Sequence, residues 1–233
     1  MTITYHPDLI QGSEEWFEAR RGLLTASEID RIITPTLKIA SNEKTRMHLY
    51  ELLAQRISGY VEPSYVGDDM LRGYEDEILA CERYSLEYAP VTSCGFVTND
   101  EFGFVIGCSP DGLVGDDTTG GILECKSRRQ KYQVQTIVEN VTADTIPDDY
   151  VIQVQTELLV TRRPWCDFIS YSGGLPMVVI RVYPDAKIQE AIIQAATDFE
   201  AKIAEKWAIY RAAKTMKAAR MVPTERRVVQ EMF

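Results

Sequence analysis

Apolar residues recur at helical spacing through the first ninety residues, and polar capping residues precede most of these runs. Helices are therefore predicted in four segments: about 13–20, Thr25 through Ile33, 42–58, and 69–88. Ser13 and Asn42 suit helix starts, and Gly59 suits a helix stop. The N-terminal third of the chain is thus expected to be helical.

The apolar positions of these helices are expected to face a core. They are Ile29, Ile32 and Ile33 in the second helix, Met47, Tyr50, Leu53 and Ile57 in the third, and Leu71, Ile78 and Leu79 in the fourth.

Shorter apolar runs separated by turn residues replace the helical period after residue 90. Strands are predicted in a hairpin over 95–107 with its turn at Asn99-Asp100, and over 113–114, 121–126, 168–171 and 177–183. Two further helices are predicted, one over 148–160 with Val151, Val154, Leu158 and Leu159 as its apolar side, and one from Asp185 to about Met216.

This order of elements predicts an α/β fold in which a mixed sheet is flanked by helices. With 233 residues, the chain fits a single domain spanning 1–233. We expect N-terminal helices over about 13–90, a central sheet core over about 91–183, and a C-terminal amphipathic helix over about 185–220.

The composition, 45% hydrophobic and 26% charged, is that of an ordinary globular enzyme. No apolar run reaches the roughly 18 residues of a membrane span, and the N-terminus lacks the pattern of a signal peptide. We therefore expect a cytoplasmic protein with no membrane partner. The five cysteines form no C-x-x-C pair and are expected to be reduced thiols, and two distant histidines make a zinc site improbable.

The net charge of −10 argues at first against a nucleic-acid partner. The basic residues are clustered, however. Eight lie between Lys202 and Arg227 against two acids, and a second group spans Lys126 to Lys131. Such asymmetry allows DNA to bind on one side, although the C-terminal cluster is equally typical of a solvated helix face.

The segments Ser109-Pro-Asp111-Gly and Glu124-Cys-Lys126 carry the most informative chemistry. Alternate residues of a strand share a face, so Glu124 and Lys126 project together while Cys125 turns into the core. Hairpin pairing across 112–121 brings Asp111 beside Glu124. Two converging carboxylates favour a hard cation, Mg²⁺ or Mn²⁺, which activates water for phosphodiester hydrolysis. The alternative, an exposed cross-strand ion pair and a turn-capping aspartate, is weaker because the two segments occur together.

The pattern P-D-G…E-x-K resembles the PD-(D/E)XK nuclease superfamily, with its restriction-endonuclease-like core. More narrowly it is similar to the phage lambda exonuclease, or YqaJ-type viral recombinase, family. The matching segments occur in the expected order: Trp16 to Ser27 (W-x-x-x-R-x-G-x-x-T-A-S), Gly73 to Glu77 (G-x-x-x-E), Cys108 to Leu113, Glu124 to Lys126, and Tyr150 to Gln155 (Y-x-x-Q-x-Q).

The resemblance implies that Asp111, Glu124 and the backbone carbonyl of Cys125 bind Mg²⁺, for which Mn²⁺ substitutes, and that Lys126 assists the attacking water. It implies a further carboxylate from Glu77 and a role for Gln153. Each of the last two residues has an alternative interpretation. If the helix is rotated, Glu75 would take the place of Glu77. Gln153 would instead be a buried polar residue whose side chain bonds to backbone.

The resemblance also implies that Arg20, Ser27 and Ser109 bind the 5′-phosphate of a DNA end. A helix N-terminus at Ser27 and a bidentate guanidinium at Arg20 suit an anion. The alternatives are that Ser27 is only an N-cap, that Arg21 replaces Arg20, and that Trp16 is a core residue.

The function implied is Mg²⁺-dependent 5′→3′ degradation of one strand of linear double-stranded DNA, leaving 3′ single-stranded overhangs for phage-type recombination. A trimeric ring, a single-strand annealing partner and a phage or prophage gene in a bacterial cytoplasm are also implied. The competing hypotheses are an endonuclease or nickase without end dependence and a non-catalytic DNA-binding module. A RecB-like iron–sulfur nuclease is rejected because no cysteine follows Cys166.

Overall fold

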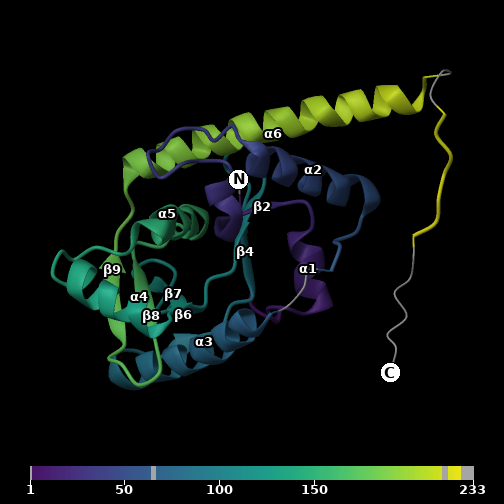
Figure 1. Cartoon of the computed structure of the whole chain (residues 1–233). Helices are drawn as coiled ribbons and strands as arrows, with labels where there is room; N and C mark the ends of the chain where they lie inside the picture. Colours follow the sequence, from purple (N-terminus) through teal and green to yellow (C-terminus); the bar gives the residue numbers. More distant parts are fainter. Residues whose placement is uncertain (1, 64–66, 217–219, 227–233) are drawn as a thin grey trace, which may run out of the picture.

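The strands of the chain form two separate mixed sheets, as the computed structural model shows for residues 2–63, 67–216 and 220–226 (Figure 1). In spatial order, the first contains β1 (Ile3–His6), β4 (Phe96–Asn99), β5 (Ile106–Cys108) and β2 (Leu24–Thr25). The second contains β3 (Val91–Thr92), β6 (Gly112–Val114), β7 (Gly121–Ser127), β8 (Cys166–Tyr171) and β9 (Val178–Val182). The predicted mixed α/β architecture is confirmed, but the single sheet is replaced by two.

The helices of the N-terminal part are α1 (Glu14–Arg20), the 3₁₀ helix η1 (Ala26–Arg31), α2 (Glu43–Ser58) and α3 (Asp68–Glu87). Those of the C-terminal part are α4 (Gln130–Gln135), the π-helical turn η2 (Thr136–Val141), α5 (Asp148–Thr161) and α6 (Ala186–Lys214). The predicted caps are confirmed: the Ser13 side chain accepts from Trp16 N, and Asn42 accepts from Thr45 N. Gly59 ends α2 with φ of 63°, in the left-handed region that glycine adopts without strain.

The predicted hairpin over 95–107 exists as β4 and β5, but residues 100–105 separate the two strands, so the turn is longer than Asn99-Asp100. The second helix is a short 3₁₀ helix rather than an α-helix. The segment α4–η2 was not predicted, because its buried positions include the polar residues Gln133 and Thr136.

The predicted core faces of α2 and α3 are wrong for most residues. Met47 and Tyr50 are exposed, and α2 buries His48, Leu49, Leu52 and Leu53. On α3, Leu71, Ile78 and Leu79 are exposed, while Ala80 and Tyr84 are buried. The inner face of α3 carries small, polar and aromatic residues, which a count of aliphatic side chains does not detect.

The five-stranded sheet is covered on both faces. Val154 and Leu158 of α5 pack with Ile122, Phe168 and Ile180 on one face. On the other, Ala80 and Tyr84 of α3 pack with Leu123, Cys125 and Ile169. Both faces of β7 are therefore buried, and Cys125 turns into the core as predicted.

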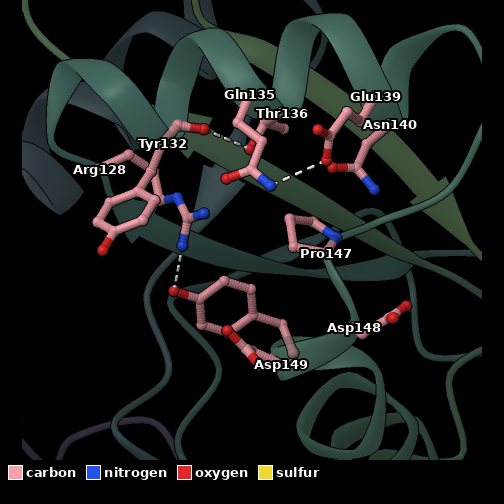
Figure 2. A pocket seen from close by; sticks show the side chains of 10 residues that line it. Arg128, Tyr132, Gln135, Thr136, Glu139, Asn140, Pro147, Asp148 and Asp149 are labelled. Carbon is pink, nitrogen blue, oxygen red and sulfur yellow. Dashed lines mark hydrogen bonds between the residues drawn. The ribbon is translucent and has the colours of Figure 1, made fainter.

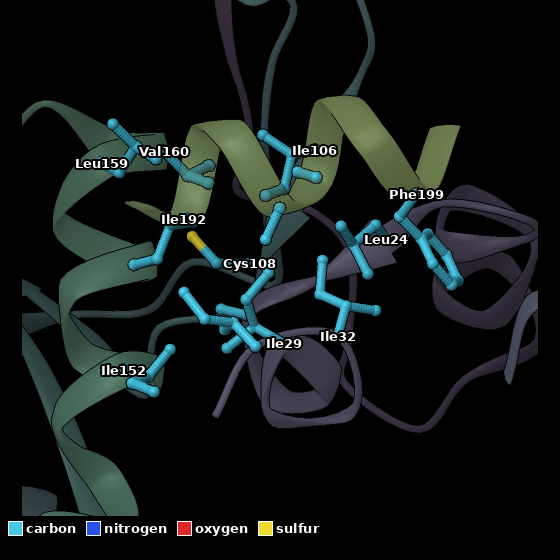
Figure 3. Close-up of a cluster of buried hydrophobic side chains, with 14 of the residues drawn as sticks. Leu24, Ile29, Ile32, Ile106, Cys108, Ile152, Leu159, Val160, Ile192 and Phe199 are labelled. Carbon is cyan, nitrogen blue, oxygen red and sulfur yellow. The ribbon is translucent and has the colours of Figure 1, made fainter. Parts of the chain in front are cut away.

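A larger apolar cluster joins the first sheet to η1, α2, α5 and α6 (Figure 3). Ile29 of η1 and Ile32, which caps its C-terminal end, share this cluster with Ile106, Val160 and Phe199. The helix α5 contacts strands of both sheets, β4 and β5 as well as β8. This shared helix sets how the two sheets lie relative to each other.

The long helix α6 runs across α2, and its C-terminal end extends beyond the body of the protein (Figure 1). A bidentate ion pair between Arg56 and Glu200, at 2.6 and 2.7 Å, ties the two helices together. Of the C-terminal basic cluster, Lys217 and Arg227 lie outside the described residues. Among the helices of the described ranges, none is both long and apolar enough to span a bilayer.

The hairpin of β6 and β7 is held at its turn by Arg163, which is only 2% exposed. The guanidinium donates to the carbonyl oxygens of Val114, Asp116 and Gly121 and, at 2.6 Å, to the Asp117 carboxylate. The buried cation stabilises the hairpin strongly because removing it takes the donor away from the enclosed carbonyl oxygens, whereas the exposed Asp117 carboxylate would be solvated by water.

We predict that Arg163→Met lowers the free energy of unfolding by about 3 kcal/mol, measured by urea denaturation. The matched control is Arg162→Met, which removes a partly exposed ion pair with Glu101 and a guanidinium 5.4 Å from the centroid of the Phe102 ring. That control should change stability by less than about 1 kcal/mol. Equal losses in the two variants would contradict the role of Arg163.

Candidate active site

Asp111 is bound to β7 through both its backbone and its side chain. Its N–H donates to the Leu123 carbonyl at 3.0 Å, and its Oδ2 accepts from the Cys125 N–H at 2.6 Å. The ladder pairs Gly112 with Leu123, so the next position of the hairpin sets Asp111 opposite Glu124. The predicted juxtaposition of these two acids is confirmed.

Glu124 is the centre of a buried polar network. It is 2% exposed, forms a close ion pair with Lys126, and accepts from the Gln153 amide at 2.6 Å. The same amide donates to Glu157 at 2.9 Å. Gln153 therefore bridges two carboxyl groups and is not bonded to backbone, which was the alternative interpretation. Lys126 also lies over the Tyr150 ring, 5.3 Å from its centroid.

Glu77 approaches this site from α3. Positions 77, 80, 81 and 84 lie on one side of the helix, and Tyr84 fixes that side against the sheet by donating to Asp167 at 2.6 Å. Asp167 also accepts from Arg181 at 2.7 and 2.8 Å. Glu77 is half-buried while Glu75 is exposed, so this orientation selects Glu77 over Glu75.

Burial and neighbouring charges shift the pKa values of several groups in this cluster. Burial, then Glu124 and Glu77, raise the pKa of Asp111 well above its usual range, although the residue retains some exposed surface. Burial and Glu124 likewise raise the pKa of Glu157. Burial raises the pKa of Glu77, opposed by a hydrogen bond with Asp111. Burial disfavours the charged form of Lys126, but Glu124 and Asp111 outweigh it and raise the pKa of that ammonium group.

These residues fit a hard divalent cation. Asp111 and Glu124 offer carboxylate oxygens from paired positions, Glu77 offers a third, and Lys126 alone cannot neutralise them all. Asp111 and Glu124 would hold the ion, with Glu77 and the Cys125 carbonyl as the further predicted donors. The Cys125 thiol points away and lies 3.7 Å from the Cys81 thiol.

A second cluster, of two carboxyl groups and an imidazole, has the spacing of metal ligands but does not suit a cation. The ligand atoms of Glu28, His48 and Glu51 lie within 4.8 Å of one another. Arg31 Nη1 already lies among them, at 3.2 Å from Glu28, 3.0 Å from His48 Nδ1 and 3.0 Å from Glu51. The guanidinium neutralises these groups and occupies the position that an ion would take.

The three residues predicted to bind phosphate lie together, because the hydroxyl groups of Ser27 and Ser109 surround the Arg20 guanidinium. Arg20 donates to Ser109 at 3.1 Å and to Ser27 at 3.3 Å, and also to Thr25 at 3.2 Å. Its guanidinium stacks on Trp16 at 4.2 Å, and the Trp16 indole donates to Ser109 at 3.0 Å. Trp16 is thus half-buried beneath the cluster, not a plain core residue. Burial lowers the pKa of Arg20, and the side chain remains a cation.

The geometry excludes two alternative interpretations of this cluster, Arg21 in place of Arg20 and Ser27 as an N-cap. Arg21 points elsewhere, donating to the Gly59 carbonyl and pairing with Glu18. Ser27 is not an N-cap, because Thr25 holds that position of η1. The helix-dipole argument for Ser27 is nevertheless weak, since η1 has only six residues.

Glu157 and Tyr150 had not been predicted as site residues. Glu157 is fully buried, and its Oε2 has no hydrogen-bond partner among the described residues. Its position four residues after Gln153 sets both on one side of α5, a signal that was present in the sequence. Tyr150 lies in the Y-x-x-Q segment that had been noted, three residues before Gln153.

Two acids and a lysine at the central strand of a mixed sheet, with helices on both faces, match a nuclease of the PD-(D/E)XK class. Residues 15–164 match the YqaJ-like viral recombinase domain. The chain belongs to this family. No curated protein matches it significantly.

Similar solved structures include an alkaline exonuclease, LHK-Exo, from Laribacter hongkongensis, at 32% identity and a TM-score of 0.69. The match covers 88% of this chain and 100% of that one. Its complex with dAMP matches at 33% identity, with the same TM-score and coverage. A phage-related exonuclease from Haemophilus somnus 129PT, at 14% identity and a TM-score of 0.50, shares the fold over 79% of this chain and 96% of that one. The chain is accordingly an enzyme of the exonuclease type.

The raised carboxyl pKa values predict a pH effect on stability. The buried carboxyl groups have higher pKa values in the native state than in the unfolded chain, where they ionise at about pH 4. As pH rises from about 4 through the raised pKa values, the native state therefore loses stability relative to the unfolded chain. In EDTA, the melting temperature should therefore fall from pH 5 to pH 8, and Asp111→Asn should flatten this slope. Mg²⁺ should raise the melting temperature more at pH 8 than at pH 5, because it competes with protons. A melting temperature in EDTA that rises with pH would contradict the assignment.

Proposed function

We propose that this enzyme is a Mg²⁺-dependent exonuclease that degrades one strand of linear double-stranded DNA from its 5′ end, leaving a 3′ overhang. The observation that carries the proposal is the short segment Ser109-Pro110-Asp111, which links the Arg20 cluster to the acidic site. Two residues span at most about 7 Å. An end bound at Ser109 therefore lies about one nucleotide from the carboxylates, which suits stepwise removal of terminal nucleotides.

The chemistry follows from what each side chain can do. A bound Mg²⁺ supplies a water of lowered pKa and screens the charge of the phosphodiester. Lys126, held by Glu124 and Tyr150, is positioned to orient that water and to stabilise charge on the phosphoryl oxygens. Gln153 fixes Glu124 by donating to it, so that the carboxylate keeps its orientation. Mn²⁺ is expected to substitute, because it accepts the same oxygen ligands.

The Arg20 cluster supports recognition of the end. Ser27 is exposed and Arg20 and Ser109 are half-buried, so a phosphate can reach all three. A guanidinium and two hydroxyl groups supply several donors to one anion. The LHK-Exo relative, 33% identical, was crystallised with dAMP, which supports a deoxynucleotide as the ligand of this chain.

Assembly and context complete the proposal. A trimeric ring would let an acidic chain, with net charge −10, enclose DNA with its clustered basic residues while its exterior repels DNA. The 3′ strand would then be available to a single-strand annealing protein in phage-type recombination. We propose accordingly that the enzyme acts in the cytoplasm of a bacterial host and is encoded by a phage or prophage.

The first prediction from this proposal concerns hydrolysis. Lys126→Ala should reduce the rate of loss of linear duplex about 100- to 1000-fold, the usual effect of removing one group that stabilises a transition state. EDTA should abolish the activity. Lys38→Ala, an exposed lysine outside the site, should retain the wild-type rate. Cutting of closed circular DNA at a similar rate would favour an endonuclease instead.

The second prediction concerns the 5′-phosphate. Wild-type enzyme should degrade phosphorylated duplex faster than unphosphorylated duplex. Arg20→Lys, which loses the forked donor, should reduce that preference about 10- to 150-fold, since hydrogen bonds to charged groups contribute about 1.5–3 kcal/mol. Arg21→Lys is the matched neighbour and should preserve the preference. Equal rates on both substrates in the wild-type enzyme would refute the end-binding role.

A further inference from the structure

A polar groove of about 490 Å³ lies between the α4–η2 segment and the first turn of α5 (Figure 2). Its volume is within the range of small-molecule binding sites. The residues that line it are Arg128, Tyr132, Gln135, Thr136, Glu139, Asn140, Pro147, Asp148, Asp149 and Tyr150. Of these residues Tyr150 also lies beside Lys126 of the acidic site, and none belongs to the Arg20 cluster. We call it the α4–α5 groove.

One end of the α4–α5 groove is basic and aromatic. The Arg128 guanidinium lies 5.2 Å from the ring centroids of both Tyr132 and Tyr150, and it donates to the Tyr150 hydroxyl at 2.5 Å. Its Nε is buried without a hydrogen-bond partner among the described residues. The Lys131 ammonium, just outside the lining residues, lies 4.6 Å from the centroid of the Tyr132 ring, and Tyr132 is 42% exposed. This end offers positive charge beside a partly exposed aromatic residue.

The other end of the groove carries amides and carboxylates. Gln135 donates to Glu139 at 2.9 Å, and both residues are exposed. Asp148 and Asp149 lie in the first turn of α5, opposite them. Three carboxylates repel a run of phosphates. Amide and carboxyl groups do, however, match the hydrogen-bonding edges of nucleobases.

The α4–α5 groove adjoins the acidic site. Tyr150 has Lys126 at 5.3 Å and Arg128 at 5.2 Å from its ring centroid. Arg128 follows Lys126 by two residues, directly after β7. A nucleotide strand held at Lys126 would therefore meet the basic end of the groove first.

We propose that the α4–α5 groove binds one unstacked nucleotide of the DNA substrate. Its phosphate faces Arg128 and Lys131, its base stacks on Tyr132, and the base edge meets Gln135 and the carboxylates. Arrangements of this kind, with aromatic stacking beside positive charge, bind single-stranded nucleic acid with little sequence preference. The inference rests on the proposed function, because it adds a subsite to the same substrate.

The test uses linear duplexes with a 5′-phosphate and 2-aminopurine, a fluorescent adenine analogue, at one position at a time near the end. Binding is measured with the full chain in Ca²⁺, with which no hydrolysis is expected. We expect one position to change its emission on binding, and Tyr132→Ala to abolish that change. The same variant should weaken binding about 5- to 150-fold, the effect of losing one base–aromatic stack.

Two variants serve as controls. Tyr132→Phe keeps the aromatic face and should behave as the wild type, while Tyr183→Ala removes an exposed tyrosine outside the groove and should have no effect. If the wild type binds DNA but no emission change depends on Tyr132, the groove proposal fails and the proposed function stands. If the wild type does not bind these duplexes at all, both fail.

Discussion

The attachment of Asp111 to β7 is the interaction on which the active site depends. One hydrogen bond from its N–H and one to its carboxylate place it opposite Glu124. Burial first, and then the concentration of negative charge beside β7, raises the pKa values of Asp111, Glu77 and Glu157. Lys126 and the Gln153 amide offset part of this charge, and a bound divalent cation would offset more. The same groups that stabilise the site are those to which we assign its chemistry.

Because the strands form two sheets, the Arg20 cluster lies beside the carboxylate site. The chain leaves β5 in the first sheet, passes through Ser109-Pro110-Asp111, and enters β6 in the second. Ser109 remains with Arg20 and Ser27, whereas Asp111 joins β7. The Arg20 cluster, which we propose binds phosphate, and the carboxylate site are adjacent because one short segment crosses between the sheets. The helix α5 packs on strands of both sheets beside that crossing.

The sequence patterns predicted whether a segment is a helix or a strand more accurately than which of its faces is buried. Capping residues located α1 and α2 closely, since a cap acts over three or four residues. The face of α3 was misjudged because its inner positions are Glu77, Cys81 and Tyr84, which serve the site and the Asp167 network, while Leu71 and Ile78 face outward. The α4–η2 segment was missed for a similar reason: it buries polar side chains, such as Gln133, that bond to distant backbone.

Asp111, Glu124 and Lys126 were determined by the sequence itself, because a two-residue strand period and one hairpin place them together by local geometry. The family motifs extended this to Glu77, Gln153, Arg20, Ser27 and Ser109, whose proximity the structure then confirmed. Only the tertiary structure decided that Glu77 rather than Glu75 turns inward, that Glu157 joins the network, and that a groove opens beside Tyr150. Each depends on how helices far apart in the chain pack against β7, and packing is a property of the whole fold, not of any one segment.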